Sequence, residues 1–259
     1  MRQHLYTILI LTIFLLTGCV IDKGEAPIVV AEIAKEFSLQ MQETLDTNGR
    51  SFILRVSTIK EYDCSNYSIQ YIWRNQGNAL LLSLLRIAAP FACDYKPGKI
   101  LAETTAGKLE TGNYPISVDL RGAIINKGTL SVLPDRYRLR LDTEHGLSIE
   151  QKDLLRVPAE SIWGYINFSP NLSDQALQLV QEIFALSQPI DLPKGYYGYY
   201  AIDDKGLSIE GQPEDASTYP FLRRSAADNG AIAAIIKKYR DLYPSALQIV
   251  VRDGKGRHY

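Results

Sequence analysis

Residues 67–74 are Tyr67-Ser68-Ile69-Gln70-Tyr71-Ile72-Trp73-Arg74, in which Tyr67, Ile69, Tyr71 and Trp73 alternate with a second set that is polar except at Ile72. Successive strand residues point to opposite faces of a sheet, so this alternation indicates a strand with one buried face and one solvated face. Such a strand is not stable alone, because its apolar face must be covered by a second layer. The stretch therefore predicts a domain built from sheets.

The same period of two recurs on both sides of this stretch. It is found at residues 52–57, 80–87, 114–120, 129–133 and 137–141. Turn-forming residues stand between these segments, at 75–78, 96–98, 110–113, 126–128 and 133–135. We expect seven or eight short strands that form a β-sandwich over residues 36–145, with a small β-barrel as the alternative.

A motif within this region refines the expectation. Leu109-x-x-Gly112-x-Tyr114-x-Ile116 resembles the tyrosine corner of immunoglobulin-like and fibronectin type III domains. The resemblance implies an immunoglobulin-like sandwich in which the Tyr114 hydroxyl binds nearby backbone. The chain departs from antibody domains because neither Cys64 nor Cys93 follows Tyr114 by two residues.

The second half of the chain follows a different pattern, and we place the boundary within residues 143–158, closed by Pro158. Strands are expected at 161–168, 196–203, 207–210 and 247–252, with a looser stretch around Pro213 and Pro220. Two helices are expected, one after Pro170 and one before Pro244. Their buried faces should carry Leu172, Ala176, Leu179, Val180 and Ile183 in the first and Ile232, Ile235, Ile236, Tyr239 and Leu242 in the second. The order βαββαβ predicts a ferredoxin-like α+β domain over residues 159–259.

The N-terminus indicates export. Arg2 precedes an apolar run over residues 5–16 that is too short to span a bilayer as a helix, as in a secretory signal. The run ends in Leu16-Thr17-Gly18-Cys19, which resembles the lipobox of bacterial lipoprotein precursors. The resemblance implies cleavage after residue 18 and acylation of Cys19, for example with palmitate, leaving residues 19–35 as a tether. Val20 stands where an aspartate often marks retention in the inner membrane, so the resemblance implies the outer membrane. An ordinary signal peptide with a chance cysteine is the alternative.

Composition agrees with an exported globular protein. The 28 basic and 29 acidic side chains give a formal net charge of −1, which does not favour nucleic acid as a partner. Removal of the signal leaves roughly 240 residues, enough for two domains. No later apolar run has the length of a membrane span, so we expect the lipid alone to attach the protein. Sixteen tyrosines against seven phenylalanines favour sheet structure and a binding surface.

The cysteines predict a disulfide. If Cys19 is acylated, Cys64 and Cys93 remain as a pair in an oxidising compartment. Two buried free thiols or a catalytic cysteine are the alternatives. Catalysis is disfavoured because a thiolate nucleophile normally needs a histidine, and only His145 and His258 remain after the signal.

Common catalytic motifs are missing from the sequence, which has no HExxH, GxSxG, glycine-rich phosphate loop or CxxC. We therefore assign no catalytic residue, no metal ligand and no cofactor. His145 is interpreted as a solvated linker residue and Gly254-Lys255-Gly256 as a flexible tail. A weak calcium site is a minor alternative for the acids Asp203, Asp204, Glu210, Glu214 and Asp215, of which the first two should shape a turn.

Aromatic residues provide the strongest candidate site. In a ferredoxin-like domain two helices cover one face of the sheet, and the other face stays open. Trp163 and Tyr165 alternate with Ile162, Ile166 and Phe168, so they should lie on the open face. We expect them to bind a ligand or partner together with Tyr197 and Tyr199 from Tyr196-Tyr197-Gly198-Tyr199-Tyr200. The alternative is that these rings pack against the sandwich or a second copy of the chain.

These patterns together predict a lipid-anchored protein of the bacterial envelope, in the outer membrane, with a non-catalytic binding or assembly role. The partner would be another envelope protein or a cell-envelope glycan. One alternative is a glycan- or peptide-binding module that uses the open sheet face, and another is a hydrolase with an unrecognised site.

Overall fold

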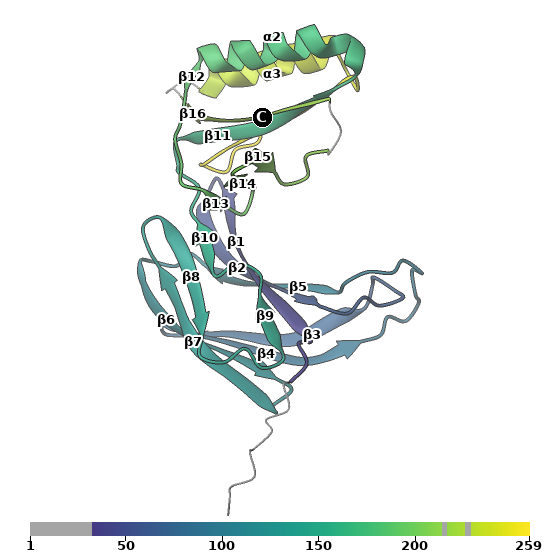
Figure 1. Ribbon diagram of the computed structural model, residues 1–259, viewed down its shortest axis with the longest axis vertical. Helices are drawn as coiled ribbons and strands as arrows, with labels where there is room; N and C mark the ends of the chain where they lie inside the picture. Colours follow the sequence, from purple (N-terminus) through teal and green to yellow (C-terminus); the bar gives the residue numbers. More distant parts are fainter. Residues whose placement is uncertain (1–32, 214–216, 226–228) are drawn as a thin grey trace, which may run out of the picture. The chain divides into compact units, whose positions relative to one another are not determined.

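The computed structural model describes residues 33–213, 217–225 and 229–259 (Figure 1). The predicted signal, the lipobox with Cys19, and most of the tether lie outside the described residues. Two parts follow one another in the chain, a mainly β part and an α+β part, as the sequence predicts.

The first part contains two sheets that share one core. One sheet has, in spatial order, β5 (Leu101–Gly107), β2 (Gly49–Thr58), β1 (Phe37–Asp46) and β9 (Leu147–Ile149). The other has β10 (Asp153–Leu155), β8 (Arg136–Leu141), β7 (Ile124–Val132), β6 (Gly112–Leu120), β4 (Ala79–Ala88) and β3 (Ser68–Gln76). Most neighbouring strands are antiparallel, but β1 pairs with β9, and β4 with β6, in parallel.

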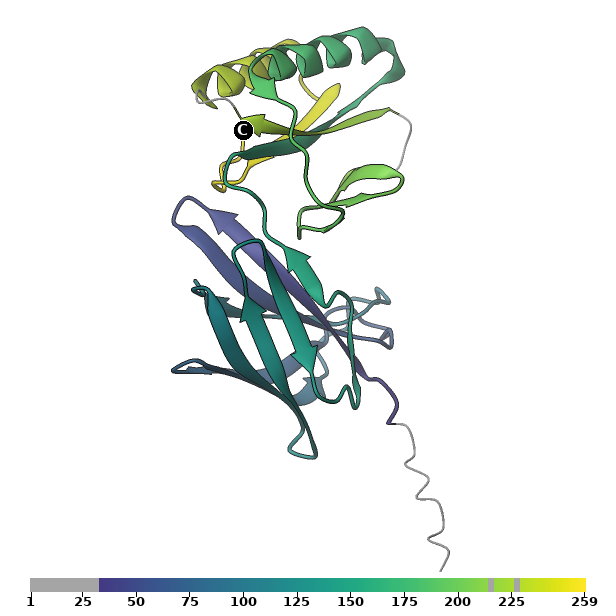
Figure 2. The ribbon, with the colours of Figure 1, turned by 60° about the vertical axis from the view of Figure 1, so that its left-hand side comes forward.

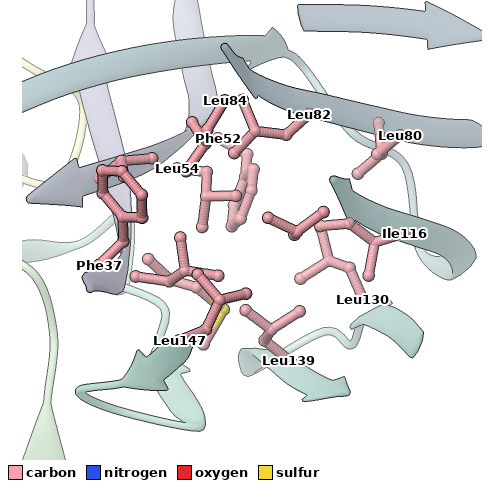
Figure 3. Packing of buried hydrophobic residues seen from close by; sticks show 14 of the residues in the cluster. Phe37, Phe52, Leu54, Leu80, Leu82, Leu84, Ile116, Leu130, Leu139 and Leu147 are labelled. Atoms are coloured by element: carbon pink, nitrogen blue, oxygen red, sulfur yellow. The ribbon is translucent and has the colours of Figure 1, made fainter. Parts of the chain in front are cut away.

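Inward-facing residues of both sheets fill this core (Figure 3). Phe52, Leu54 and Val56 of β2 are buried, as their alternation predicts, and Leu80, Leu82 and Leu84 of β4 meet them from the other sheet. Burying an aliphatic or aromatic side chain of this size contributes about 1.5–3 kcal/mol each. The two sheets are therefore held together mainly by apolar packing.

The tyrosine motif forms the expected hydrogen bond. The Tyr114 hydroxyl donates to the Glu110 carbonyl oxygen at 2.9 Å, while Leu109 and Ile116 are buried in the core. The bond ties the start of β6 to the segment before it.

Asn126-Lys127-Gly128 is not the turn that the sequence predicts, because these residues lie inside β7. The chain reverses earlier, where the Gly122 amide donates to Asp119 Oδ1 and Gly122 takes a φ of 70°. Asn126 is buried and binds the backbone of His145 through both ends of its amide. Gly128 lies against β8, where an added Cβ would be 2.0 Å from the Arg140 carbonyl oxygen. Asn126 therefore holds the backbone of His145 from inside the protein, and Gly128 allows β7 and β8 to approach closely.

The presumed linker also belongs partly to the sandwich. Residues 147–149 form β9, which extends the first sheet beside β1, and residues 153–155 form β10, which pairs with β8. The sandwich thus continues past the predicted limit at residue 145. Strands of three residues are too short to show an alternation in sequence.

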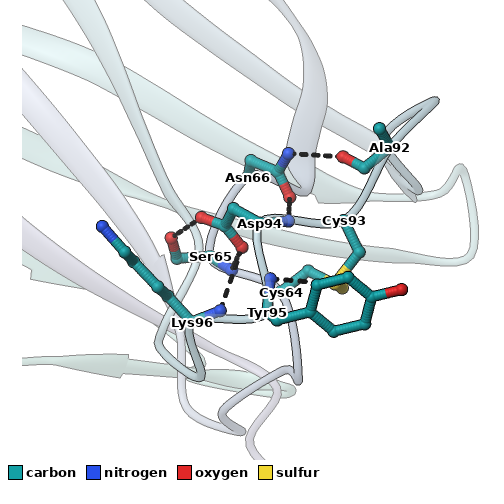
Figure 4. Close-up of a disulfide and its surroundings, with 8 residues drawn as sticks. All are labelled: Cys64, Ser65, Asn66, Ala92, Cys93, Asp94, Tyr95 and Lys96. Atoms are coloured by element: carbon teal, nitrogen blue, oxygen red, sulfur yellow. Dashed lines mark hydrogen bonds between the residues drawn. A yellow bond between two sulfur atoms is a disulfide. The ribbon is translucent and has the colours of Figure 1, made fainter.

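Cys64 and Cys93 form the expected disulfide, with Cα atoms 5.4 Å apart (Figure 4). Further bonds join the same two loops: Asp94 accepts hydrogen bonds from the Ser65 hydroxyl and amide, and Asn66 Nδ2 donates to the Ala92 carbonyl. The Ser65 hydroxyl bond holds the pKa of the Asp94 carboxyl below its usual value.

The second part has a sheet with the order β12-β16-β11-β17, in which all neighbours are antiparallel. Two helices lie together on one face of it (Figures 1 and 2). Its elements are β11 (Ser161–Phe168), a 3-10 turn η1 (Pro170–Leu172), α2 (Ser173–Ala185), β12 (Ser187–Gln188), β16 (Thr218–Ser225), α3 (Asn229–Leu242) and β17 (Leu247–Asp253). Among the described residues, neither helix is long and apolar enough to cross a membrane.

The helix faces agree closely with the sequence pattern. The buried residues of α2 are Ala176, Leu179, Val180 and Ile183, as expected, whereas Leu172 lies in η1 before the helix and is only partly buried. In α3, Ile232, Ile236 and Tyr239 are buried, but Leu242 ends the helix and is 59% exposed. The expectation for Leu242 is therefore wrong, and the buried stripe of α3 stops at Tyr239.

The expected strand at residues 196–203 is instead a hairpin. β13 (Gly195–Tyr196) and β14 (Tyr200–Asp203) pair with one another, and β15 (Gly206–Ile209) adds a third strand to this separate small sheet. Gly198 lies where the chain reverses between β13 and β14. Its φ of 83° is a backbone conformation that residues other than glycine rarely adopt.

The central strand β16 lies in the stretch expected to be loose because of Pro220. Proline lacks an N–H group and is normally confined to strand edges. Here β12 pairs only with Arg224 and Ser225, so within the described sheet the side of β16 away from β11 is unpaired at Pro220. The proline is tolerated because the neighbouring strand is only two residues long.

Replacing both Cys64 and Cys93 by Ser should lower the free energy of unfolding. For a sequence separation of 29 residues, the chain-entropy model gives a loss of roughly 3.5 kcal/mol. Denaturant unfolding of oxidised wild type and double variant measures the difference. Reduced wild type is the control and should match the variant; an unchanged midpoint in both would contradict the prediction.

Candidate functional site

The face of β11 opposite the helices is covered by another part of the chain, which is one of the alternatives that the sequence leaves open. Trp163 and Tyr165 do lie on this face, as the alternation predicts, but they are only 2% and 5% exposed. They belong to a buried group, here called the junction cluster, which consists of Leu45, Leu155, Val157, Trp163, Tyr165, Tyr197, Tyr200 and Ile209.

The junction cluster draws residues from both parts of the chain. Leu45 comes from the end of β1 and Leu155 from β10, both in the sandwich, whereas the aromatic residues come from β11 and the β13–β15 sheet. The structure thus realises the alternative in which these rings pack against the sandwich.

Ring contacts and hydrogen bonds hold the cluster in one arrangement. The Tyr197 and Tyr200 rings stack at 4.8 Å, and Trp163 lies 5.4 Å from Tyr200 and 5.5 Å from Tyr199. The Tyr199 hydroxyl accepts a hydrogen bond from the Leu45 amide at 2.8 Å. The hydroxyls of Tyr165 and Tyr197 donate to backbone carbonyls in the same part of the chain. The four predicted binding residues therefore join the two parts.

Burial changes the acidity of these tyrosines. Removal from water disfavours the charged phenolate, so the pKa of Tyr197 is raised to about 12, and those of Tyr199 and Tyr200 are also raised. These three phenols therefore ionise only at a higher pH than an exposed tyrosine does.

The Gly254-Lys255-Gly256 segment is a tightly packed turn, so the expectation of a flexible tail is wrong. An added Cβ would lie 2.4 Å from Asp46 at Gly256 and 2.0 Å from the Pro158 carbonyl oxygen at Gly254. Asp253 is buried and accepts hydrogen bonds from the amides of Lys255 and Arg257. Burial raises the pKa of this carboxyl, but the hydrogen bonds outweigh burial and hold the pKa below its usual value.

A cavity of about 490 Å³ opens beside the junction cluster. Tyr197 lines it, together with Arg50 from β2 and Arg156 from the connection to the second part. Its remaining walls are mostly apolar and include Pro134 and Pro193.

A buried carboxylate holds the two arginines of this cavity. Glu43 is fully buried, accepts a hydrogen bond from Arg50 Nη1 at 2.8 Å, and lies 3.5 Å from Arg156 Nε. The Tyr137 hydroxyl donates to the same carboxylate at 2.9 Å, and its pKa is raised by burial and by the Glu43 charge. The backbone completes the arrangement, because Arg50 Nη2 donates to the Val157 carbonyl and Arg156 Nη1 to the Leu133 carbonyl.

The sequence pattern does not single out these charged residues. One signal was present: Glu43 follows Leu39 and Met41 at inward-facing positions of β1, where a carboxylate is out of place. A charge at such a position indicates a buried partner, although the sequence does not say which arginine supplies it.

Among the described residues, the acids considered for calcium do not gather. Asp203 Oδ1 accepts hydrogen bonds from the amides of Lys205 and Gly206 and so shapes the turn, as expected, while Asp204 pairs with Lys194. Glu214 and Asp215 lie outside the described residues. Within residues 33–213, 217–225 and 229–259, no three His, Cys, Asp or Glu side chains are grouped so as to hold a metal ion.

Fold and site together define a two-part protein, a β-sandwich joined to an α+β layer through a buried aromatic cluster. The chain matches no protein-family model, no curated protein and no solved structure.

Trp163→Ala should destabilise the whole chain, because it removes the largest side chain of the junction cluster. Truncating a buried tryptophan typically costs about 3–5 kcal/mol. Leu242→Ala, at an exposed position, is the control and should change stability by less than about 0.5 kcal/mol. Denaturant unfolding measures both, and equal small effects would mean that Trp163 is not part of a core.

The raised pKa of Tyr197 should make the protein sensitive to alkali. A pKa above the unfolded value of about 10 contributes stability that is present below that pH and is lost as the pH rises towards about 12. The free energy of unfolding should fall by about 1.4 kcal/mol per pH unit for this group in that window. Tyr197→Phe should have a shallower profile, measured by denaturant unfolding at several pH values. An identical pH profile in the variant would contradict the prediction that Tyr197 causes this loss of stability.

Proposed function

We propose that this chain is a lipid-anchored protein of the bacterial cell envelope, held by an acylated Cys19, with a non-catalytic binding or assembly role. The observation that carries the proposal is the Cys64–Cys93 disulfide, because disulfides persist in oxidising compartments outside the cytosol. It agrees with the signal and lipobox pattern of residues 1–19. Attachment to the outer membrane rests on Val20, and the partner would be another envelope protein or a glycan.

The contacts between the two parts support a binding role in which both parts act together, rather than as two independent modules. Leu45 of the sandwich is buried with Trp163 of the second part, and its amide binds the Tyr199 hydroxyl. A partner would therefore meet a surface whose two halves are fixed relative to one another. Glycan or peptide binding on the β11 face is not retained, because that face is covered.

We also propose the finer fold assignments. The order β17-β11-β16-β12, with antiparallel neighbours and both helices on one face, supports a ferredoxin-like second part that carries the β13–β15 sheet as an insertion. The Tyr114 hydrogen bond supports an immunoglobulin-like first part, whereas the two parallel strand pairs weigh against it.

Cys19→Ala should abolish lipid labelling and release the protein from membrane fractions, because the lipid is the proposed attachment. Metabolic labelling with a fatty acid and fractionation of membranes measure both effects. Cys64→Ser is the matched control and should keep the label. Tight membrane association of Cys19→Ala would overturn the proposal of a lipid anchor.

A further inference from the structure

We infer that the cavity beside the junction cluster binds a small organic monoanion, a carboxylate carried on an apolar body. The inference goes beyond the proposed function, because it adds a small ligand to the proposed protein or glycan partner. The volume of about 490 Å³ lies within the range of about 300–1,000 Å³ that is usual for small-molecule sites.

The two arginines offer free donors to such a ligand. A guanidinium carries five N–H groups in a planar fork that matches the two oxygens of a carboxylate. Arg50 donates to Glu43 and Val157, and Arg156 donates to Leu133. The buried Nε of Arg156 lies against Glu43, so the donors left over within the described chain are the other N–H groups of the two side chains. Both side chains line the cavity and are about one-fifth exposed, at 23% and 20%.

The charges at the cavity favour a ligand with a single negative charge. Arg50 and Arg156 carry two positive charges and the buried Glu43 carries one negative charge, which leaves one positive charge to be balanced. Asp135, which also lines the cavity, is paired with Arg136 at 2.7 Å, so this ion pair adds no net charge to the count. A monoanion completes the balance, whereas a dianion such as phosphate would bring a surplus negative charge towards Glu43.

The walls of the cavity favour an apolar body for the ligand. Pro134, Leu192 and Pro193 present apolar surface, and the Tyr197 ring closes one side. Both arginines are held by backbone carbonyls as well as by Glu43, so binding requires little ordering of long side chains. An alkyl or aryl carboxylate fits these walls better than a polar anion.

The test measures binding to the full purified chain in detergent by calorimetry, with phenylacetate as the probe. Phenylacetate should bind at least about tenfold more tightly than its neutral amide, phenylacetamide, because hydrogen bonds to a charged group are the stronger ones. Inorganic phosphate should bind more weakly than phenylacetate. Equal affinity for acid and amide, tighter binding of phosphate, or no binding of phenylacetate would overturn the inference.

Variants locate the site. Arg156→Gln should weaken phenylacetate binding about tenfold and leave phenylacetamide unchanged. Arg138→Gln is the matched control, because Arg138 pairs with Asp153 outside the cavity lining, and it should not alter binding. Ala159→Trp places a ring in the cavity without changing charge and should abolish binding of both probes, which keeps the test decisive if Arg156→Gln does not fold. Unchanged binding in Ala159→Trp would place the ligand elsewhere.

This outcome is independent of the anchor. Loss of lipid labelling in Cys19→Ala tests the envelope proposal, whereas the calorimetry reads only the cavity. Normal lipid labelling without phenylacetate binding would reject the ligand and leave the envelope proposal standing.

Discussion

A sheet that carries large side chains on both faces has to be covered on both, and the second part of this protein is built around that demand. The helices cover Ile162, Ile166 and Phe168, and the insertion between β12 and β16 covers Trp163 and Tyr165 together with the end of β1. The apolar area of β11 is thus removed from water on both sides, the dominant favourable contribution to folding. Because the sandwich supplies part of the second cover, this face of β11 is not fully buried without it.

The buried Glu43 carboxylate imposes the second constraint. An ion removed from water costs several kcal/mol unless it is paired and hydrogen-bonded. The demand is met by Arg50, Arg156 and Tyr137, which come from β2, from the connection after β10, and from β8. The same contacts hold the two guanidinium groups at the cavity wall. A requirement of folding therefore produces the preorganised charge that a ligand would use.

The features that were predicted correctly from the sequence are those that depend on local residues. The alternation in β2 and β11, the helix stripes, the tyrosine corner bond and the cysteine pair were all readable, since each depends on nearby spacing or on counting. In the second part, β12 was missed because it has two residues, and β16 was missed because it contains Pro220. The face of Trp163 was predicted correctly, but its cover comes from segments far away in sequence. The arginine pair was missed for the same reason: Arg50 and Arg156 meet only when β2 and the connection are packed together.

β1 also has a mechanical meaning. Its first residue, Phe37, follows the segment that leads from the proposed anchor, and its far end contacts the second part through Leu45 and Asp46. A force that pulls residue 33 away from the second part would run lengthwise along this strand. Its ladder with β2 extends from Phe37 opposite Thr58 to Asp46 opposite Gly49, with hydrogen bonds perpendicular to the strand. Such bonds share a lengthwise load and do not break one after another. The β1–β2 ladder should therefore resist this force as one unit.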